Sequence, residues 1–140
     1  MKRKQNVIGV IPARYQSTRF EGKPLALILG QPLIYHVYRQ CVKCKLLDAV
    51  IVATDDDRIV KCVDEFGGTS MLTKADHPTG TDRVAEVAKH TKADIVVNIQ
   101  GDEPLVSPGM INSLVRPLLV DRSVYVTNAI AQIEDLGDYL

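Results

Sequence analysis

The first apolar run of the chain, residues 7–11, is rich in β-branched side chains and has no polar alternation. Such a run is typical of a strand buried on both faces, as in a parallel sheet. Pro12 cannot donate a ladder hydrogen bond, so we expect the strand to end there. Ligands of open α/β sheets bind beyond the carboxyl ends of the strands, which directs attention to the residues that follow.

The loop after this strand carries three cations, two hydroxyl groups and a flexible glycine: Arg14, Ser17, Thr18, Arg19, Gly22 and Lys23. Arginine favours bidentate phosphate contacts, whereas lysine acts more as a point charge. The composition therefore favours a ligand with several negative charges, and a nucleoside triphosphate is the first hypothesis. From this loop alone, a solvated basic surface remains an equal alternative.

The spacing of glycine, lysine and hydroxyl residues in this loop excludes two common phosphate-binding motifs. A Walker A loop places Ser or Thr directly after its lysine, but Lys23 is followed by Pro24. A Rossmann fingerprint needs three closely spaced glycines, and only Gly9 and Gly22 are near. We therefore expect side chains, rather than a helix amino end, to supply most of the positive charge.

Composition limits the class of protein. The chain has 140 residues, 46% hydrophobic and 24% charged, which suits one globular domain with a core. Lys plus Arg and Asp plus Glu both number 17, a balance that argues against a general nucleic-acid or membrane-surface binder. No apolar run is long enough to span a bilayer, and the first one is too short for a secretory signal. A cytoplasmic location is expected.

The chain has three cysteines, and Cys41 and Cys44 form a C-x-x-C pair. This spacing occurs in zinc and redox sites. Both cysteines lie within an amphipathic helical pattern, however, and no second Cys/His pair completes a tetrahedral site. An odd number of cysteines also argues against a disulfide framework, so we expect structural thiols.

Helical and strand-like patterns alternate along the chain. Gly67 is expected to end the second helix in a left-handed conformation, and Pro117 to end or kink the fourth. Together, these alternating elements predict an α/β fold with a mostly parallel, doubly wound, Rossmann-like sheet and helices on both faces. Helices are expected over 33–42 and around 59–66, after Thr81 as N-cap and after Ser107 as N-cap, with strands over 7–11, 48–54, 69–73, 94–100 and 123–133.

Two more polar segments follow predicted strands. In residues 74–83, Gly80 and Thr81 place backbone N–H groups near a helix amino end, which favours an anion or a base carbonyl. Asp102 comes just after the strand at 94–100, where a carboxylate is suited to Mg²⁺, although a simple turn residue is an equal alternative. The acidic run 55–57 could mimic a metal site, but favourable interaction with the helix dipole explains it better.

Three motifs carry a resemblance to a known family. They are Pro12-Ala-Arg14 with Ser17-Thr-Arg19 and Gly22-Lys-Pro24, then His77-Pro-Thr-Gly-Thr-Asp-Arg83, then Val97-Asn-Ile-Gln-Gly-Asp-Glu-Pro104. Together they resemble the cytidylyltransferases that activate acidic sugars, and among these the 3-deoxy-manno-octulosonate (Kdo) cytidylyltransferases. The resemblance covers nearly the whole chain. The sialic-acid enzymes share the first motif but not the other two in this form.

The resemblance implies a nucleotidyltransferase that moves CMP from CTP to Kdo, giving CMP-Kdo and pyrophosphate with Mg²⁺ for lipopolysaccharide biosynthesis. CTP and an acidic sugar are the implied partners, and a homodimer is implied for the full-length family member, with no role for nucleic acid or membrane. The implied catalytic residues that hold the triphosphate are Arg14, Arg19 and Lys23, with Ser17 also at the nucleotide. Implied near the cytosine are Ala13, Thr79, Gly80, Thr81 and Arg83, with Gln100 at the sugar and Asp102 at the metal.

Two departures from the family pattern stand out. Glu21 occupies a position that is usually proline, which places a negative charge inside the basic loop. The chain is also shorter than family members, so we expect residues 1–140 to be the nucleotide-binding part of a cytidylyltransferase domain that is truncated at its carboxyl end. Two alternatives stay open: a catalytically inactive nucleotide-binding fragment, and a cytidylyltransferase for another acidic sugar such as a sialic acid.

Overall fold

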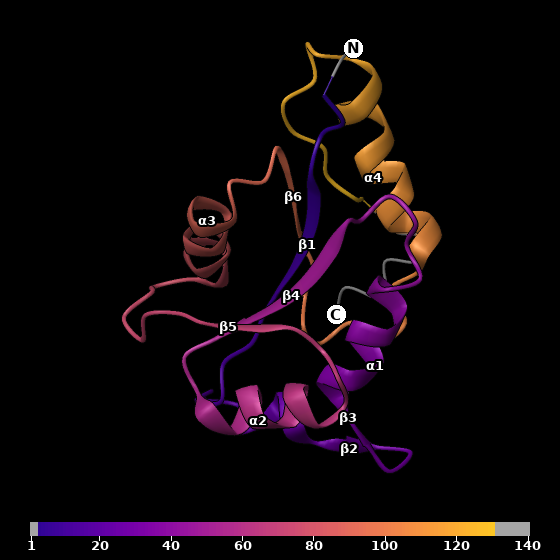
Figure 1. Cartoon of the computed structure of the whole chain (residues 1–140). Helices are drawn as coiled ribbons and strands as arrows, with labels where there is room; N and C mark the ends of the chain where they lie inside the picture. Colours follow the sequence, from indigo (N-terminus) through magenta and orange to yellow (C-terminus); the bar gives the residue numbers. More distant parts are fainter. Residues whose placement is uncertain (1–2, 131–140) are drawn as a thin grey trace, which may run out of the picture.

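A four-stranded parallel sheet forms the centre of the structure, a computed structural model that describes residues 3–130 (Figure 1). Its order is β5-β4-β1-β6. The central strand β1 (Val7–Pro12) pairs in parallel with β4 (Ala49–Thr54) on one side and β6 (Ile95–Asn98) on the other. At one edge, β5 (Ser70–Leu72) pairs in parallel with β4. The predicted parallel α/β sheet is confirmed.

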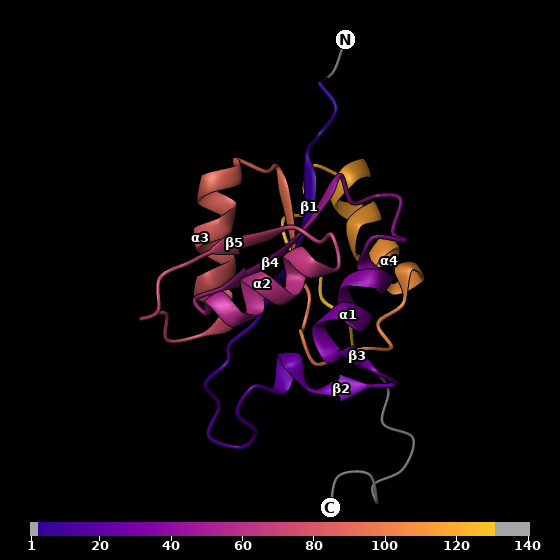
Figure 2. The ribbon, with the colours of Figure 1, turned by 60° about the horizontal axis from the view of Figure 1, so that its bottom comes forward.

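Helices cover both faces of this sheet, as predicted (Figure 2). One face packs against α1 (Leu33–Cys41), α2 (Asp57–Glu65) and α4 (Pro108–Val120). The other face packs against α3 (Gly80–Thr91). Alternate β1 side chains supply the two layers, because successive residues of a strand point to opposite faces. None of the helices within residues 3–130 has the length and apolar character needed to cross a membrane.

The predicted structural role of the C-x-x-C cysteines is confirmed. Cys41 and Cys44 are both buried free thiols in the core beside α1. Burial raises the pKa of the Cys41 thiol to about 12. The Cys44 thiol donates a hydrogen bond to Oδ1 of Asn112 at 3.0 Å.

The predicted ends of α2 and the predicted start of α4 are confirmed. Asp56 is the N-cap of α2 and accepts a hydrogen bond from the backbone N–H of Arg58, while Gly67 follows the helix with φ 73°. Ser107 is the N-cap of α4, with proline in the first turn. Pro117, however, does not end that helix, which continues to Val120. Apolar side chains beyond the proline pack against the core, which offsets the one backbone hydrogen bond that proline removes.

A short antiparallel hairpin between β1 and α1 was not predicted. It pairs β2 (Leu27–Ile28) with β3 (Gln31–Pro32) through a turn in which Leu29 and Gly30 both have positive φ, 51° and 77°. Positive φ at both central residues suits the right-handed twist of a hairpin. Each strand has only two residues, too few to produce a pattern of alternating polarity in the sequence.

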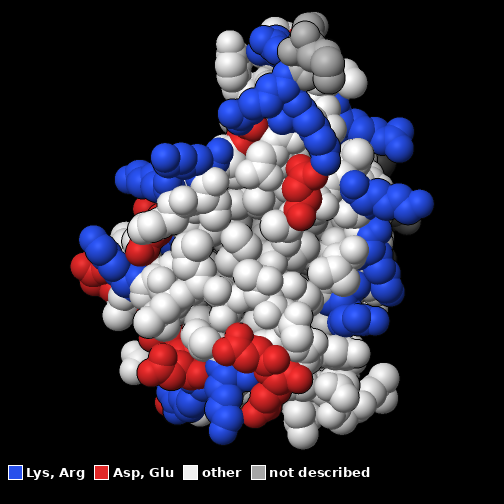
Figure 3. Space-filling model, in the orientation of Figure 1, with Lys and Arg blue, Asp and Glu red and all other residues white. Residues whose placement is uncertain are grey.

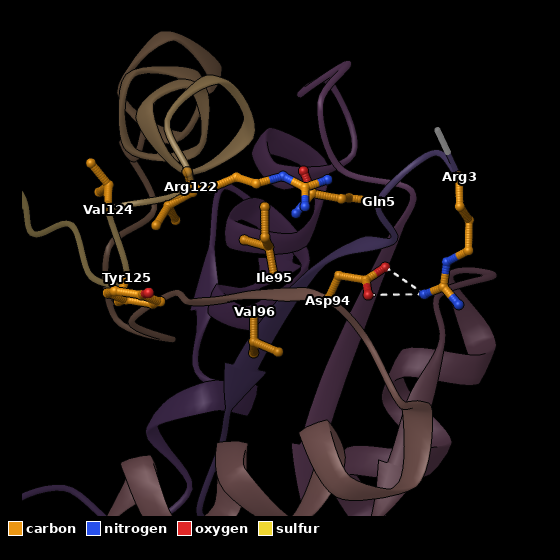
Figure 4. Close-up of a pocket in the computed structure, with 9 residues that line it drawn as sticks. Arg3, Gln5, Asp94, Ile95, Val96, Arg122, Val124 and Tyr125 are labelled. Carbon is orange, nitrogen blue, oxygen red and sulfur yellow. Dashed lines mark hydrogen bonds and ion pairs between the residues drawn. The ribbon is translucent and has the colours of Figure 1, made fainter. Parts of the chain in front are cut away.

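The fifth strand predicted for residues 123–133 is wrong over 123–130, and 131–133 lie outside the described residues. A cavity of about 580 Å³ separates the start of this segment from β6 (Figure 4). In that view Val124 and Tyr125 lie at the left, and Ile95 and Val96 of β6 lie to their right. The β-branched pattern favours an extended backbone, but a strand also needs a neighbour with which to form a hydrogen-bonded ladder.

Charges of both signs are distributed over the surface. In Figure 3, Lys and Arg side chains gather at the top and along the right-hand edge, while acidic and basic side chains mix at the bottom, where α2 lies. The middle of this face is uncharged. The basic side chains thus lie mainly at the rim of this face, while the formal net charge of the whole chain is +0.

Replacing Ile34 by alanine should lower the free energy of unfolding by about 2–5 kcal/mol, because this α1 side chain is fully buried and its removal leaves a cavity. Ile130→Ala is the matched control, since Ile130 is 93% exposed and its truncation should change stability by less than about 0.5 kcal/mol. Urea denaturation of both variants measures the difference. Equal stabilities would show that α1 does not pack as described.

Candidate functional site

Three loops meet at one edge of the sheet because they follow parallel strands. Loop 1 (residues 13–22) follows β1, loop 2 (73–79) follows β5 and loop 3 (99–107) follows β6. Glycines let their backbones approach Pro12 at the end of β1. A Cβ added at Gly80 would lie 3.3 Å from Cγ of Pro12, and one at Gly101 would lie 3.1 Å from its carbonyl oxygen. The loops therefore enclose the carboxyl end of β1.

Two cations of the first motif link these loops. The Arg14 guanidinium donates a hydrogen bond to the backbone carbonyl of His77 in loop 2 at 2.9 Å. Directly after loop 1, the 3-10 turn η1 (Lys23–Leu25) places the Lys23 ammonium 2.8 Å from a carboxylate oxygen of Asp102 in loop 3. Groups from all three sequence motifs are thus joined at this edge.

A cavity of about 470 Å³ opens between loop 1 and loop 3. Seven of the site residues predicted from the sequence line it: Ala13, Arg14, Ser17, Arg19, Lys23, Gln100 and Asp102. Leu33 at the start of α1 and Pro24 add apolar surface. The lining is mainly polar and cationic, with one carboxylate, and so is suited to an anion with several charged groups.

The charged side chains around this cavity differ in whether an oppositely charged side chain lies close to them. The hydrogen bond from Lys23 holds the pKa of the Asp102 carboxyl below its usual range, and both side chains are about half exposed. Within residues 3–130, no carboxylate lies within ion-pair distance of the Arg19 guanidinium. The Ser17 hydroxyl accepts hydrogen bonds from the backbone N–H groups of Arg19 and Phe20, both at 3.4 Å. Ser17 therefore stabilises the turn that carries Arg19.

Asp102 can supply one of the ligands of a divalent cation. Among the described residues, no three His, Cys, Asp or Glu side chains cluster closely enough to enclose a metal ion. Mg²⁺ usually keeps several waters and is bound through one or two carboxylates together with substrate phosphates. A single half-exposed carboxylate at the mouth of a cationic cavity fits a metal ion that arrives with a phosphate ligand.

Arg83 is buried, with 1% of its surface exposed. Its guanidinium pairs with Asp55 at 3.2 Å, and it donates hydrogen bonds to the Thr73 hydroxyl and, at 3.2 Å, to the carbonyl of Lys74. Its Nε has no partner among the described residues. Burial lowers the pKa of Arg83, while the nearby Asp55 charge opposes that shift. Arg83 lines a second cavity of about 380 Å³, which shares Arg14 with the first.

The predicted N-cap of α3 is corrected from Thr81 to Thr79. The Thr79 hydroxyl accepts from the backbone N–H of Asp82 at 3.2 Å, and the Asp82 carboxylate accepts from the backbone N–H of Thr79 at 3.1 Å. This reciprocal capping box is favoured because it satisfies two helix-end donors at once. Gly80 and Thr81 occupy the first turn of α3, and Thr79, Gly80 and Thr81 line neither cavity.

Sequence reasoning missed three residues that support the site: Tyr15, Asp55 and Arg58. Asp55 pairs with Arg83, and the Arg58 guanidinium lies 3.2 Å from the centroid of the Tyr15 ring. Both contacts join residues distant in sequence, so no local pattern predicts them. A weak signal was Tyr15 itself, one of two bulky aromatic residues, with Phe20, in a mostly polar loop.

Comparison with known proteins assigns the family. A sequence model of the cytidylyltransferases matches residues 8–139. This chain belongs to the cytidylyltransferase family. It is 52% identical to the 3-deoxy-manno-octulosonate cytidylyltransferase of Pelobacter propionicus, over 96% of the chain and 53% of the relative. It is 54% identical to the enzyme of that name from Syntrophobacter fumaroxidans, over 95% of the chain and 54% of the relative. The chain thus spans about half the length of these relatives.

Solved structures give the same family with the same partial coverage. The chain superimposes on a CMP:2-keto-3-deoxy-manno-octonic acid synthetase complexed with CTP with a TM-score of 0.83 and 43% identity, covering 85% of this cytidylyltransferase chain and 49% of the other. A cytidylyltransferase from Leptospira borgpetersenii matches with a TM-score of 0.76, over 85% of this chain and 51% of the other. At 24% identity, the second match supports the fold alone.

Thr79→Ala should destabilise this cytidylyltransferase chain by about 0.5–2 kcal/mol, because it removes the capping box of α3. Thr81→Ala is the matched control and should cost less than about 0.5 kcal/mol, since Thr81 is exposed within the first turn. Chemical denaturation of both variants tests the assignment. A larger loss in Thr81→Ala would reinstate the cap predicted from the sequence.

Proposed function

We propose that residues 1–140 form the CTP-binding part of an enzyme that transfers CMP from CTP to Kdo and releases pyrophosphate. The observation that carries this proposal is the cavity in which Arg14, Arg19 and Lys23 face Asp102 across loops 1 and 3. The sequence identity of about half to the named Kdo cytidylyltransferases supports the same reaction. CTP and the acidic sugar are its proposed partners.

The proposed chemistry is an in-line displacement at the α-phosphorus of CTP. The anomeric hydroxyl of the sugar loses its proton and forms a new bond to the phosphorus, while the bond from that phosphorus to the pyrophosphate oxygen breaks. Such a reaction depends on positioning and charge neutralisation rather than on a covalent nucleophile from the protein. Three cations around one cavity, held by links between loops, provide what this chemistry needs.

The residues receive roles according to their places around the two cavities. Arg14, Arg19 and Lys23 bind the triphosphate, with Ser17 shaping the turn beneath it, and Gln100 contacts the sugar. The cytosine lies near Ala13 and the second cavity, whose wall includes the buried guanidinium of Arg83. The backbone N–H groups of Gly80 and Thr81, in the first turn of α3 beside Pro12, are the proposed donors to the base, since helix amino ends attract partial negative charge. Thr79 fixes this turn through the capping box.

Mg²⁺ is the proposed cofactor, and Asp102 is its proposed ligand. When bound, the ion would supply charge neutralisation at the phosphates. Asp102 is paired with Lys23 in this structure, so a metal ion held by Asp102 would leave the Lys23 ammonium available to a phosphate group. The same ion pair keeps both side chains at the cavity before the ligand arrives.

The catalytic capacity of the 140-residue chain is a separate question from nucleotide binding. A fragment that binds CTP without turnover is the second candidate; the named relatives support the transferase, and a turnover assay on the 140-residue chain distinguishes the two. A sialic-acid specificity is not favoured, because the matched relatives are named for Kdo. The cytoplasm is the proposed compartment, because CTP is made and consumed there, and a homodimer is proposed for the full-length protein.

Arg19→Gln should weaken CTP binding about tenfold to a hundredfold, because it removes a cation whose charge no carboxylate within residues 3–130 neutralises at ion-pair distance. Titration calorimetry with CTP and Mg²⁺ measures this. Lys89→Gln is the matched control, since Lys89 lies in the last turn of α3, away from the loops. Equal affinity of Arg19→Gln and the unmodified chain, or no saturable CTP binding at all, would contradict the proposal.

Pyrophosphate release should occur with CTP, Mg²⁺ and Kdo, and not when Kdo is replaced by a sialic acid, if the 140-residue chain carries the whole activity. A phosphate-coupled assay measures both reactions side by side. Release with the sialic acid would contradict the Kdo assignment. Saturable CTP binding without release would support the second candidate, the inactive nucleotide-binding fragment.

A further inference from the structure

Arg58, in the first turn of α2, makes two kinds of contact with its side chain. Its guanidinium carbon lies 3.2 Å from the centroid of the Tyr15 ring in loop 1. Its Nε and one terminal nitrogen donate to the two carboxylate oxygens of Asp56 at 2.9 and 2.7 Å. Asp56 is itself fixed, because it caps α2 by accepting from the backbone N–H of Arg58 at 2.9 Å. The guanidinium is therefore anchored to α2 and stacked on loop 1.

Tyr15 in turn holds the two ends of the turn that carries Arg19. Its carbonyl accepts a hydrogen bond from the backbone N–H of Gly22 at 2.7 Å. Gly22 has φ 69°, and a Cβ added there would lie 3.0 Å from the Tyr15 ring, so only glycine fits against this ring without strain. The half-buried ring also packs against the main core cluster. The conformation of residues 15–22 thus depends on where the Tyr15 ring lies.

The charge of Arg58 is held mainly by its own helix. The hydrogen-bonded Asp56 is the main cause of a raised pKa at Arg58. Arg58 does not line the 470 Å³ cavity, so it acts on loop 1 from outside the predicted ligand site.

We propose that Arg58 is a positioning residue for loop 1: its guanidinium, anchored to Asp56 and stacked on Tyr15, holds residues 15–22 in the conformation that presents Arg19 to the cavity. The consequence for CTP binding rests on the proposed function. The consequence for the conformation of the loop does not.

Hydrogen exchange of the Gly22 amide in the ligand-free protein tests this inference directly. Arg58→Gln should speed that exchange about two- to fivefold, the factor that corresponds to loss of an exposed cation–π contact. Arg58→Lys, which keeps the charge, should recover part of the protection. The Ala13 amide, bonded to the Ala53 carbonyl within the sheet, is the internal reference and should be unchanged.

Arg39→Gln is the matched control, because Arg39 is an exposed arginine 5.9 Å from the centroid of the Tyr35 ring on α1. It removes the same charge and a similar contact without touching loop 1, and it should leave Gly22 exchange unchanged. A Gly22 amide unaffected by Arg58→Gln would overturn the proposal. Equal acceleration at Gly22 and Ala13 would also overturn it, since that result would mark a general loss of stability.

CTP affinity separates this inference from the proposed function. Arg58→Gln should weaken CTP binding by about the same two- to fivefold. Unchanged CTP affinity in Arg58→Gln would overturn the consequence for binding. If the unmodified chain fails to bind CTP, the proposed function fails, but the exchange of Gly22 still decides whether Arg58 positions loop 1.

Discussion

Parallel pairing of β1 on both sides is the constraint on which the rest of the structure depends. Because β4 and β6 flank β1 in the same direction, and β5 continues that direction, the loops that follow β1, β5 and β6 emerge at one edge. The sheet is buried between helices on both faces, so this edge is held rigidly. Glycines at positions 80 and 101 then allow the loops to close around Pro12. The site therefore results from the direction of the strands and from the lack of side chains at Gly80 and Gly101.

Several charged side chains at this edge are held by protein partners before any ligand is present. Lys23 pairs with Asp102, Arg83 with Asp55, and Arg14 donates to a carbonyl of loop 2. These contacts organise the cavity in advance, which lowers the cost of ordering the side chains when a ligand binds. When a ligand binds, these side chains therefore exchange their partners in the protein for groups of the ligand. Exposed ion pairs are individually weak, so a ligand with several phosphate charges can displace them.

Sequence reasoning predicted what depends on local pattern. The four strands of the sheet, its direction, the helices and seven residues of the main cavity follow from β-branched runs, helical spacing and motif position. It failed where local signals are too short or are ambiguous: the two-residue strands of the β2–β3 hairpin, and a Thr-Gly-Thr-Asp segment that offers two possible caps. It also predicted a strand at 123–133, where the composition is suitable but no ladder partner lies alongside the described part, 123–130. The stacking of Arg58 on Tyr15 joins positions 43 residues apart, and only the fold reveals it.

The central claim is that CTP binds at the edge of the sheet formed by the three loops, η1 and the start of α3. Backbone amide chemical shifts recorded during a titration with CTP and Mg²⁺ test it most directly. The account predicts that the largest changes fall in residues 13–23, 77–83 and 100–102. The larger cavity between β6 and residues 122–125, at the opposite end of the sheet, should show none. Changes centred on that cavity, with the three loops unaffected, would contradict the account.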